Sequence, residues 1–396
     1  MVTKSNQIPR SLSNLIRGMF GDGDIPLHRP VFEGNEKAYI TECIDSNFVS
    51  SVGSRVTEFE TACASFTNAK YGVATVNGTS ALHAALLVAG VAASDEVITQ
   101  ALTFVATCNA ISYCGARPVF IDVDTDTMGL SPEALEKWLS RNVVKRDGYA
   151  FNRETGARVS ACIPMHTFGI PLRIASVVEI CKSYGVRVVE DAAESLGSFV
   201  GEKHTGLFGD LGTLSFNGNK VITTGGGGMI LTDDRASAER ALHLTTTAKI
   251  PHPYEFIHDE VGYNYRLPNL NAALGCAQLE QLPDKLLAKR VLFKKYQAAF
   301  ASIDGAKLIA EPAKCKSNYW LQTIMLNADQ ENQRDCILEV TNQAGLMTRP
   351  VWRLLHHLQP FSNSPRMDLD SAEQLAQRLI NLPSSSHLSK KLNEQA

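Results

Sequence analysis

The feature that most constrains the fold is a repeated alternation of short β-branched runs with longer helical patterns through the first two thirds of the chain. This alternation is typical of βαβ units, which build a parallel sheet covered by helices on both faces. The predicted strands, rich in Val and Ile, are 71–76, 96–99, 118–122, 161–165, 186–190, 213–216 and 228–232. The predicted helices between them are 80–89, 104–113, 132–139 and 174–184.

The pattern changes near residues 250–266, and a chain of 396 residues is too long for one simple core. We expect a large domain at 1–260, with an N-terminal segment 1–33, and a smaller α+β domain at 261–396. The smaller domain is predicted from four patterns: a long helical segment 267–301, a strand 319–326 and helices 330–344 and 372–380. The polar stretch 141–158 is predicted to be a surface insertion, with a hairpin turn at 152–156.

Composition argues against several classes of protein. Hydrophobic residues make up 44% and charged residues 20% of the chain, and the net charge is −3, so neither disorder nor a nucleic-acid partner is expected. Nine cysteines without a C-x-x-C pair argue against a metal cluster or a disulfide framework. Residues 1–24 lack an apolar core of signal-peptide length, and no run of eighteen apolar residues occurs, so we expect a cytoplasmic protein with no membrane partner.

The first of three segments that carry the predicted chemistry is 76–80, Val-Asn-Gly-Thr-Ser. Here a strand ends, Gly78 turns the chain, and Thr79 and Ser80 open a helix. A helix start presents free N–H groups and a positive dipole end, which suits a phosphate. An ordinary helix cap by Asn77 or Thr79 is the alternative interpretation.

The second segment, 188–194 with the sequence Val-Val-Glu-Asp-Ala-Ala-Glu, places acids at the carboxyl end of a buried strand. Ligands bind at this end of the strands in α/β folds. A buried carboxylate needs a cationic or metal partner, and a pyridinium nitrogen is one such partner. An N-cap for the following helix is the alternative.

The third segment runs from Gly209 to Lys220 and ends in Ser-Phe-Asn-Gly-Asn-Lys, with four glycines following at 225–228. A predicted strand delivers Ser215, and the Asn-Gly-Asn turn then points Lys220 inward. The glycines allow the backbone to pass close to a bound group. A solvated loop lysine is the alternative interpretation of Lys220.

Together the segments supply a phosphate cup, a carboxylate for a ring nitrogen and an amine for an aldehyde, which are the groups that pyridoxal phosphate requires. With these motifs the sequence resembles the DegT/DnrJ/StrS sugar aminotransferases from Gly34 to Ser384. The matching stretches also include 50–53 and 258–266. The resemblance implies the aspartate-aminotransferase-like fold type I, with a mostly parallel seven-stranded sheet between helices and a small α+β domain. It also implies a homodimer with shared active sites.

The resemblance further assigns cofactor contacts. Lys220 would bond to the cofactor aldehyde, Asp191 would hold the pyridine nitrogen protonated, and Glu194 would sit beside the ring hydroxyl. Many relatives carry glutamine at the position of Glu194, so a hydrogen bond to the ring oxygen would here require a protonated carboxyl. The remaining cofactor contacts implied are a stacking ring, phosphate ligands and one partner residue: Phe104, Gly78, Thr79, Ser80, Ser215 and, from the neighbouring subunit, Asn264.

Five residues are implied to bind substrates. Arg266 matches a position near the carboxylate of the amino donor, where a guanidinium can pair bidentately; a structural ion pair is its alternative. His166 would contact the cofactor or the sugar, and a satisfied core histidine is its alternative. Trp320, Arg349 and His356 match the part of the small domain where relatives contact the nucleotide sugar.

The predicted reaction transfers an amino group from L-glutamate to C4 of a nucleotide-linked 4-keto-6-deoxy sugar, for a surface polysaccharide such as lipopolysaccharide O-antigen. The sequence looks most similar to the branch that acts on UDP-linked N-acetylhexosamines. A GDP-4-keto-6-deoxymannose 4-aminotransferase, or perosamine synthase, is the alternative. Relatives that remove a hydroxyl group carry histidine in place of Lys220. A regulator that binds the cofactor without turnover is the alternative from another class of protein.

Overall fold

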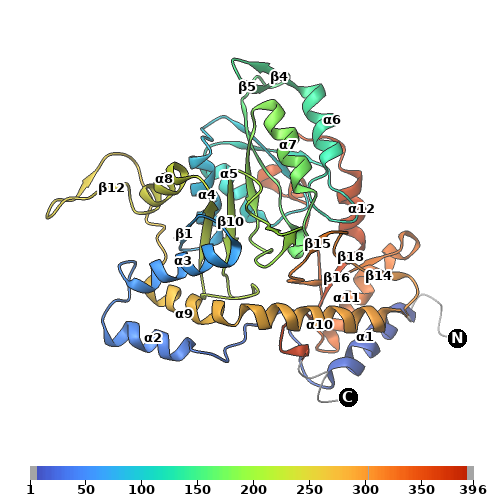
Figure 1. Cartoon of the computed structure of the whole chain (residues 1–396). Helices are drawn as coiled ribbons and strands as arrows, with labels where there is room; N and C mark the ends of the chain where they lie inside the picture. Colours follow the sequence, from blue (N-terminus) through green and yellow to red (C-terminus); the bar gives the residue numbers. More distant parts are fainter. Residues whose placement is uncertain (1–6, 302, 390–396) are drawn as a thin grey trace.

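A computed structural model describes residues 7–301 and 303–389, and a seven-stranded sheet forms the centre of its larger part (Figure 1). The strand order is β1-β11-β10-β7-β6-β2-β3. The bounds are β1 Tyr71–Thr75, β2 Glu96–Gln100, β3 Arg117–Ile121, β6 Val159–Ile163, β7 Arg187–Asp191, β10 Leu211–Ser215 and β11 Gly228–Thr232. The strands from β10 to β3 pair in parallel, and β11 runs antiparallel to β1 and β10. The predicted, mostly parallel α/β sheet is confirmed.

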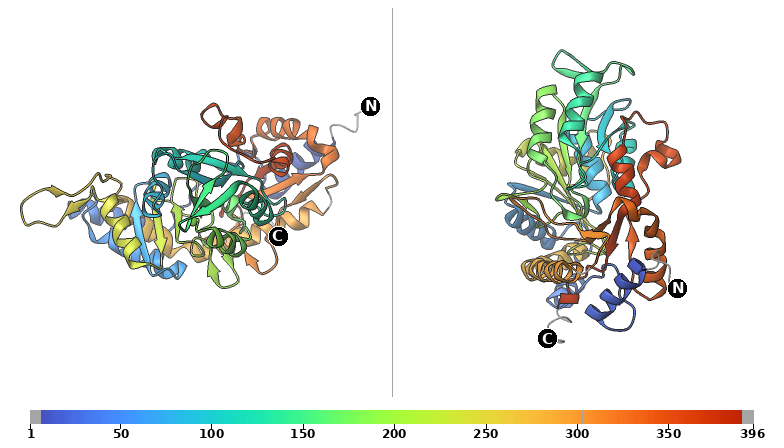
Figure 2. Two further views of the ribbon diagram at one scale, coloured as in Figure 1. Left: turned by 90° about the horizontal axis from the view of Figure 1, so that it is seen from above. Right: turned by 90° about the vertical axis from the view of Figure 1, so that its right-hand side faces the viewer.

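Helices cover both faces of this sheet (Figures 1 and 2). One face carries α4 (Gly78–Val88), α5 (Val105–Tyr113) and α8 (Arg235–Thr245), and the other carries α6 (Pro132–Asn142) and α7 (Ile174–Tyr184). Successive strand residues point to opposite faces. Val97 and Val189 pack into the first core, whereas their neighbours Ile98 and Val188 pack into the second. Burial on both faces explains why these strands are apolar throughout.

The C-terminal part contains two long helices and a small antiparallel sheet. Helices α9 (Asn269–Glu280) and α10 (Leu282–Phe300) run end to end below the large sheet (Figure 1). Gln281 separates them and Pro283, which has no N–H, opens α10, so the predicted single helix is two. The sheet order is β14-β16-β18-β17. The bounds are β14 Ala306–Leu308, β16 Gln322–Leu326, β17 Arg349–Pro350, β18 Leu379–Leu382, α11 Arg334–Gln343 and α12 Asp370–Arg378, with short 3-10 helices η3 Ala328–Gln333, η4 Leu355–His357 and η5 Gln359–Phe361.

Helix α1 (Gln7–Phe20) packs with the C-terminal part of the chain. Its Leu12, Ile16 and Phe20 share a core with Tyr296 of α10 and Ile337 of α11. These contacts favour grouping α1 with the smaller domain, although we expected the segment 1–33 beside the larger one. The domain boundary near 261 stays a prediction. Residues 1–6 and 390–396 of the predicted domains lie outside the described residues.

The insertion forms a hairpin of β4 (Val143–Arg146) and β5 (Tyr149–Asn152). Its two-residue turn is Asp147-Gly148, and both residues have positive φ, as a type I′ turn requires. The segment 152–156, where we expected the hairpin turn, is a second turn that leads into β6, closed by a bond from the N–H of Gly156 to the carbonyl of Asn152. The sequence signal for the hairpin was therefore Asp-Gly.

The remaining elements surround this frame. Helices α2 (Glu36–Asp45) and α3 (Ser54–Thr67) pack against α9, and a small sheet of β8 (Phe199–Val200), β9 (Lys203–His204) and β15 (Cys315–Lys316) joins the two parts. An arm with β12 (Lys249–Ile250) and β13 (Ile257–His258) projects from the body of the protein (Figure 1 and the left view of Figure 2). Among the described helices, none is both long and apolar enough to cross a bilayer.

Candidate active site

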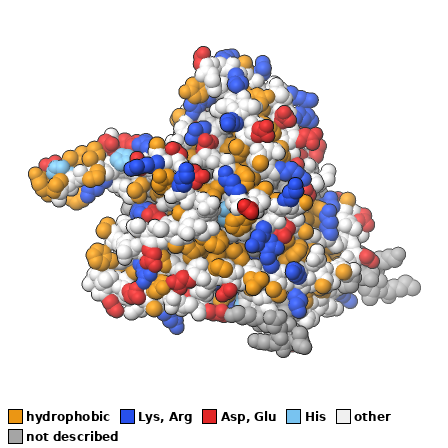
Figure 3. Space-filling model, in the orientation of Figure 1, with side chains coloured by type: hydrophobic (Ala, Val, Ile, Leu, Met, Phe, Trp, Pro, Cys, Tyr) orange, Lys and Arg blue, Asp and Glu red, His pale blue; other side chains and the backbone are white. Residues whose placement is uncertain are grey.

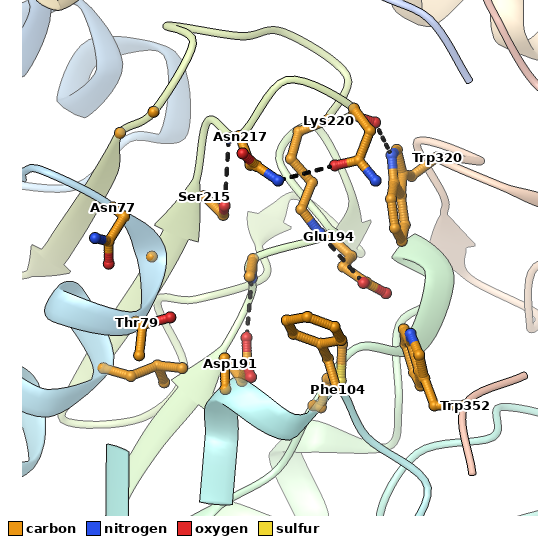
Figure 4. A pocket seen from close by; sticks show the side chains of 18 residues that line it. Asn77, Thr79, Phe104, Asp191, Glu194, Ser215, Asn217, Lys220, Trp320 and Trp352 are labelled. Atoms are coloured by element: carbon orange, nitrogen blue, oxygen red, sulfur yellow. Dashed lines mark hydrogen bonds and ion pairs between the residues drawn. The ribbon is translucent and has the colours of Figure 1, made fainter. Parts of the chain in front are cut away.

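A cavity of about 320 Å³ opens where β7 and β10 end and α4 begins (Figure 4). Eight of the predicted site residues line it: Gly78, Thr79, Phe104, Asp191, Glu194, Ser215, Lys220 and Trp320. They come from four distant segments of the large domain and one of the small domain. The residues predicted to carry the chemistry therefore lie together at the carboxyl edge of the sheet.

The start of α4 forms one wall. Asn77 is the N-cap, and its side-chain oxygen accepts the N–H of Ser80 at 2.8 Å. This bond occupies the Ser80 amide, whereas Gly78 and Thr79 face the cavity. A Cβ on Gly78 would lie 2.9 Å from the Cβ of Ser215, so glycine lets the helix start and the end of β10 lie side by side. The positive end of the helix is thus presented to the cavity.

Asp191, the last residue of β7, places its carboxylate at the floor of the cavity (Figure 4). One oxygen accepts the hydroxyl of Thr107 at 2.7 Å and the other accepts the N–H of Ala193 at 3.2 Å. Burial raises the pKa of Asp191, and these two hydrogen bonds oppose the rise. The two donors are neutral, so a cationic ring nitrogen would supply a charge that the carboxylate lacks in its direct contacts.

Lys220 enters from a loop that closes on itself. The N–H of Phe216 donates to Gly227 and the N–H of Thr224 donates back to Phe216, while the N–H of Lys220 donates to the carbonyl of Asn217. The side chain of Lys220 crosses the cavity and its Nζ lies 4.0 Å from the centre of the Trp320 ring. Trp320 is itself held by a 2.7 Å bond from Nε1 to the carbonyl of Asn219, within the same loop.

Glu194 is the direct ionic partner of Lys220. Its Oε1 lies 3.2 Å from Nζ, and its Oε2 accepts the N–H of Phe168 at 2.9 Å. Glu194 is buried, and burial raises the pKa of its carboxyl to about 7 even though Lys220 and the Phe168 amide act to lower it. A carboxyl in this range can change its proton content near neutral pH.

Aromatic rings form the wall opposite α4. Trp352 lies 4.9 Å from the Phe168 ring and 6.1 Å from the Phe104 ring, measured between centroids. Phe104 is about half exposed, at 48%, and has room for a ring above it. Phe168 adopts a positive φ of 55° although it is not glycine, in the short helix η2 (Thr167–Gly169). Such strain is typical of functional sites, where the surrounding contacts maintain it.

His166 lies outside the cavity and makes core contacts instead. Its Nδ1 accepts the N–H of Leu172 at 3.3 Å, so Nε2 carries the proton that it donates to Glu190 at 3.0 Å. The carboxylate of Glu190 also accepts amides of the loop 206–209. His166 is fully buried, and this geometry matches the alternative of a satisfied core histidine.

Five other predicted contacts also lie outside the cavity, and one of them is Ser80, whose amide is bonded to Asn77. Arg266 makes a bidentate ion pair with Glu60, which is the structural alternative weighed for it. Arg349 is exposed and donates to the side chain of Asn342 at 2.7 Å. His356 Nε2 shares one carboxylate oxygen of Glu373 with His357. Asn264 is exposed at the base of the arm, where its place toward a neighbouring subunit stays a prediction.

Several lining residues were not predicted. Asn77, Asn217 and Asn219 flank the predicted glycine and lysine, and their turn chemistry was the available signal. Trp352 had no local signal, because it reaches the cavity from a loop of the small domain. The other unpredicted lining residues are Leu82, Ala106, Met165 and Ala193, whereas Gly226 and Gly227 belong to the four glycines expected to lie close to a bound group.

Residues 30–395 match the model of the DegT/DnrJ/EryC1/StrS aminotransferase family. The chain belongs to this family. Family relatives include EpsN of Bacillus subtilis, at 38% identity over 92% of each chain. They also include GDP-perosamine synthases of Escherichia coli, at 36% identity over 94% of this chain and 95% of the relative, and of Caulobacter vibrioides, at 33% identity over 92% and 94%.

Two solved structures have the same fold. The aminotransferase TlmJ from Streptoalloteichus hindustanus superimposes with a TM-score of 0.83 at 26% identity, over 94% of this chain and all of TlmJ. DesI, solved in the presence of its TDP-sugar product, has a TM-score of 0.82 at 26% identity, over 97% of this chain and 95% of DesI. The predicted type I fold is confirmed.

The chain is thus a pyridoxal-phosphate-dependent aminotransferase of the sugar aminotransferase family. The cavity has a donor set that fits this cofactor: a buried carboxylate at Asp191, a helix start at Gly78 and Thr79, and an amine at Lys220. Thr79, Asp191 and Lys220 lie on different walls of one cavity (Figure 4), so a single planar phosphorylated ring could meet all of them.

Proposed function

We propose that this enzyme transfers an amino group from L-glutamate to C4 of a GDP-linked 4-keto-6-deoxy sugar. The observation that carries the proposal is the similarity to GDP-perosamine synthases of three organisms, at 33–36% identity over more than nine tenths of this chain. It favours the GDP alternative over the UDP-linked N-acetylhexosamine that the sequence pattern had favoured. A role in surface polysaccharide synthesis, such as that of O-antigen, goes with this substrate.

Each residue of the site has a different proposed role. When bound, the cofactor supplies an electron sink that stabilises a carbanion next to its ring. Asp191 keeps a positive charge on the ring nitrogen, because a buried carboxylate is stabilised by a cation in contact with it. Lys220 holds the cofactor in the resting enzyme and, once displaced by the donor amine, moves protons as the base. Gly78 and Thr79 bind the phosphate, and Trp320 limits the positions of Nζ.

Lys220→Ala tests the assignment of the lysine. We expect no steady-state transamination in this variant, and borohydride reduction of the wild-type holoenzyme should fix the cofactor on Lys220. Lys203→Ala is a matched control, because Lys203 is exposed and lies outside the cavity. Appreciable turnover by Lys220→Ala, or reduction that fixes the cofactor on another lysine, would refute the assignment.

A substrate panel tests the sugar. Purified enzyme with glutamate would be incubated with GDP- and UDP-linked 4-keto-6-deoxy sugars, and the aminated product would be identified by mass and NMR. We expect amination of the GDP-linked 4-keto-6-deoxymannose. Exclusive amination of a UDP-linked N-acetylhexosamine would overturn the GDP proposal. Cofactor binding without spectral conversion on adding glutamate would instead support the non-catalytic regulator.

We also propose the homodimer with shared active sites that the family resemblance implies, in the cytoplasm. The projecting arm supports it, because Tyr254 and Phe256 are each 82% exposed and Val261 is 80% exposed. Figure 3 shows hydrophobic atoms gathered along this arm, away from the body. Such apolar surface is typical of an interface. In sedimentation experiments, wild type should be dimeric, and Tyr254→Ser with Phe256→Ser should shift it toward monomer; a monomeric wild-type protein would contradict the dimer.

A further inference from the structure

The pair formed by Lys220 and Glu194 has a feature that the proposed roles leave unused. Both charges lie in the cavity wall, 3.2 Å apart, with the Lys220 side chain 14% and that of Glu194 2% exposed. Glu194 uses its two oxygens differently: Oε1 faces Nζ, and Oε2 accepts the N–H of Phe168. Oε1 can therefore gain a proton without breaking the bond that holds Phe168.

We propose that Glu194 takes up the proton that Lys220 gives up when Lys220 bonds to the cofactor, so that this proton stays in the site. The inference rests on the assignment of Lys220 in the proposed function. Glu194 would then accept a proton and, once protonated, donate a hydrogen bond. A glutamine at this position could donate a hydrogen bond only through its amide.

The proton balance is simple. Lys220 begins as an ammonium and Glu194 as a carboxylate, and one proton passes from Nζ to Oε1. The free amine then forms a double bond to the aldehyde carbon, and the aldehyde oxygen leaves as water with the two protons that remain on Nζ. No oxidant or reductant is needed. The site loses the ion pair and gains two neutral groups, which suits a buried cavity.

The electrostatic surroundings favour this transfer. Burial raises the pKa of Glu194, and the charge and hydrogen bond of Lys220 are among the contributions that lower it. When Lys220 loses its positive charge those contributions vanish, so the pKa of Glu194 rises above about 7. Asp191 on β7 acts in the same direction, because its negative charge also raises this pKa. His166, the next ionisable neighbour of Asp191, is already bonded to Glu190.

Counting protons on cofactor binding tests the inference. Pyridoxal phosphate would be added to the cofactor-free chain in weakly buffered solution, with a pH indicator or with calorimetry in buffers of different ionisation enthalpy. Glu194→Gln is the variant of choice, since its amide oxygen can still accept the N–H of Phe168. Protons from the phosphate and the ring nitrogen are common to both proteins and cancel in the difference.

Between pH 7 and 8 we expect Glu194→Gln to release up to about one proton more per chain than wild type, because the variant has no acceptor. As the pH rises above the raised pKa of Glu194, the wild-type release should increase to the same value. Equal release by the two proteins across pH 7–9 would overturn the inference. If Glu194→Gln fails to take up cofactor, a pH-independent release by wild type alone would overturn it equally.

Borohydride reduction and peptide mapping on the same samples separate the two proposals. If the cofactor is fixed on Lys220 but wild type and Glu194→Gln release equal numbers of protons, only the role of Glu194 is refuted. Cofactor fixed on a different lysine refutes the proposed function itself. An infrared difference spectrum adds a direct signature: wild type should gain the carbonyl band of a protonated carboxyl on binding cofactor, and Glu194→Gln should not.

Discussion

Lys289→Met is predicted to be among the most destabilising single changes outside the cavity. Lys289 lies on α10 and is fully buried, and its Nζ donates to the carbonyls of Tyr319, Trp320 and Ser384 at 3.3, 2.9 and 2.7 Å. Burial lowers the pKa of Lys289, whereas the three carbonyl acceptors match the three protons of an ammonium and favour the charged form. The three carbonyls belong to segments far apart in sequence that meet at this nitrogen.

The magnitude follows from what methionine leaves behind. Its side chain fills a similar volume, so the cavity contribution is small. Three buried carbonyls would lose their charged donor, at about 1–3 kcal/mol each. Removing a buried charge recovers several kcal/mol of desolvation, which offsets part of the loss, and truncating one partner of a buried charged network typically costs about 3–5 kcal/mol. We therefore expect unfolding to become easier by about 3–5 kcal/mol.

Lys295→Met is the matched control, because Lys295 is exposed on the same helix. Exposed substitutions of this kind change stability by about 0.5 kcal/mol or less. Urea unfolding of both cofactor-free variants would be followed by circular dichroism and by tryptophan fluorescence, since Trp320 contributes one of the carbonyls. A free energy of unfolding for Lys289→Met within about 1 kcal/mol of that for Lys295→Met would refute this account of the buried lysine.

Two further changes test backbone packing and the aromatic wall. Gly212→Ala would place a Cβ 2.0 Å from the carbonyl oxygen of Gly206, so we expect the thermal unfolding midpoint to fall by several degrees. A Cβ on Gly18 would meet no atom of the described residues within 4 Å, so Gly18→Ala should not lower the midpoint. Trp352→Ala removes the ring that packs 4.9 Å from Phe168, so KM for the nucleotide sugar should rise about ten-fold with cofactor content unchanged; an unchanged KM would exclude Trp352 from the sugar site.

Much of the cofactor half of the site was predictable because three of its segments lie at or just after a strand end that local sequence marks, whereas Phe104, the N-cap of α5, was indicated only by the family resemblance. Asp191 ends an apolar strand, and Lys220 follows an Asn-Gly turn, so alternation and turn chemistry were sufficient to bring them together. The bounds of β11 and α7 were predicted without error for the same reason. Where two signals competed, as in the insertion, the Asp147-Gly148 turn went unrecognised.

The contacts of the residues predicted to bind substrates depend on pairing with residues far away in the sequence, which sequence patterns do not reveal. Arg266 pairs with Glu60, which lies 206 positions earlier in the chain. His166 pairs with Glu190 across two neighbouring strands, and no periodicity distinguishes that contact from one with a ligand. Isolated polar residues in loops carry the same local signal whether they bind a ligand or a neighbour.

The small domain reaches the cavity through contacts that are independent of the cofactor motifs. The N–H of Leu355 donates to the carbonyl of Ala101, and the carboxylate of Asp122 accepts the first amides of α12, from Ser371 and Ala372. These bonds hold the loop that carries Trp352 against the large sheet. Because they involve neither Lys220 nor Asp191, changes at these contacts should move the aromatic wall while the cofactor contacts are kept. One fold can thereby serve aminotransferases that act on different nucleotide sugars.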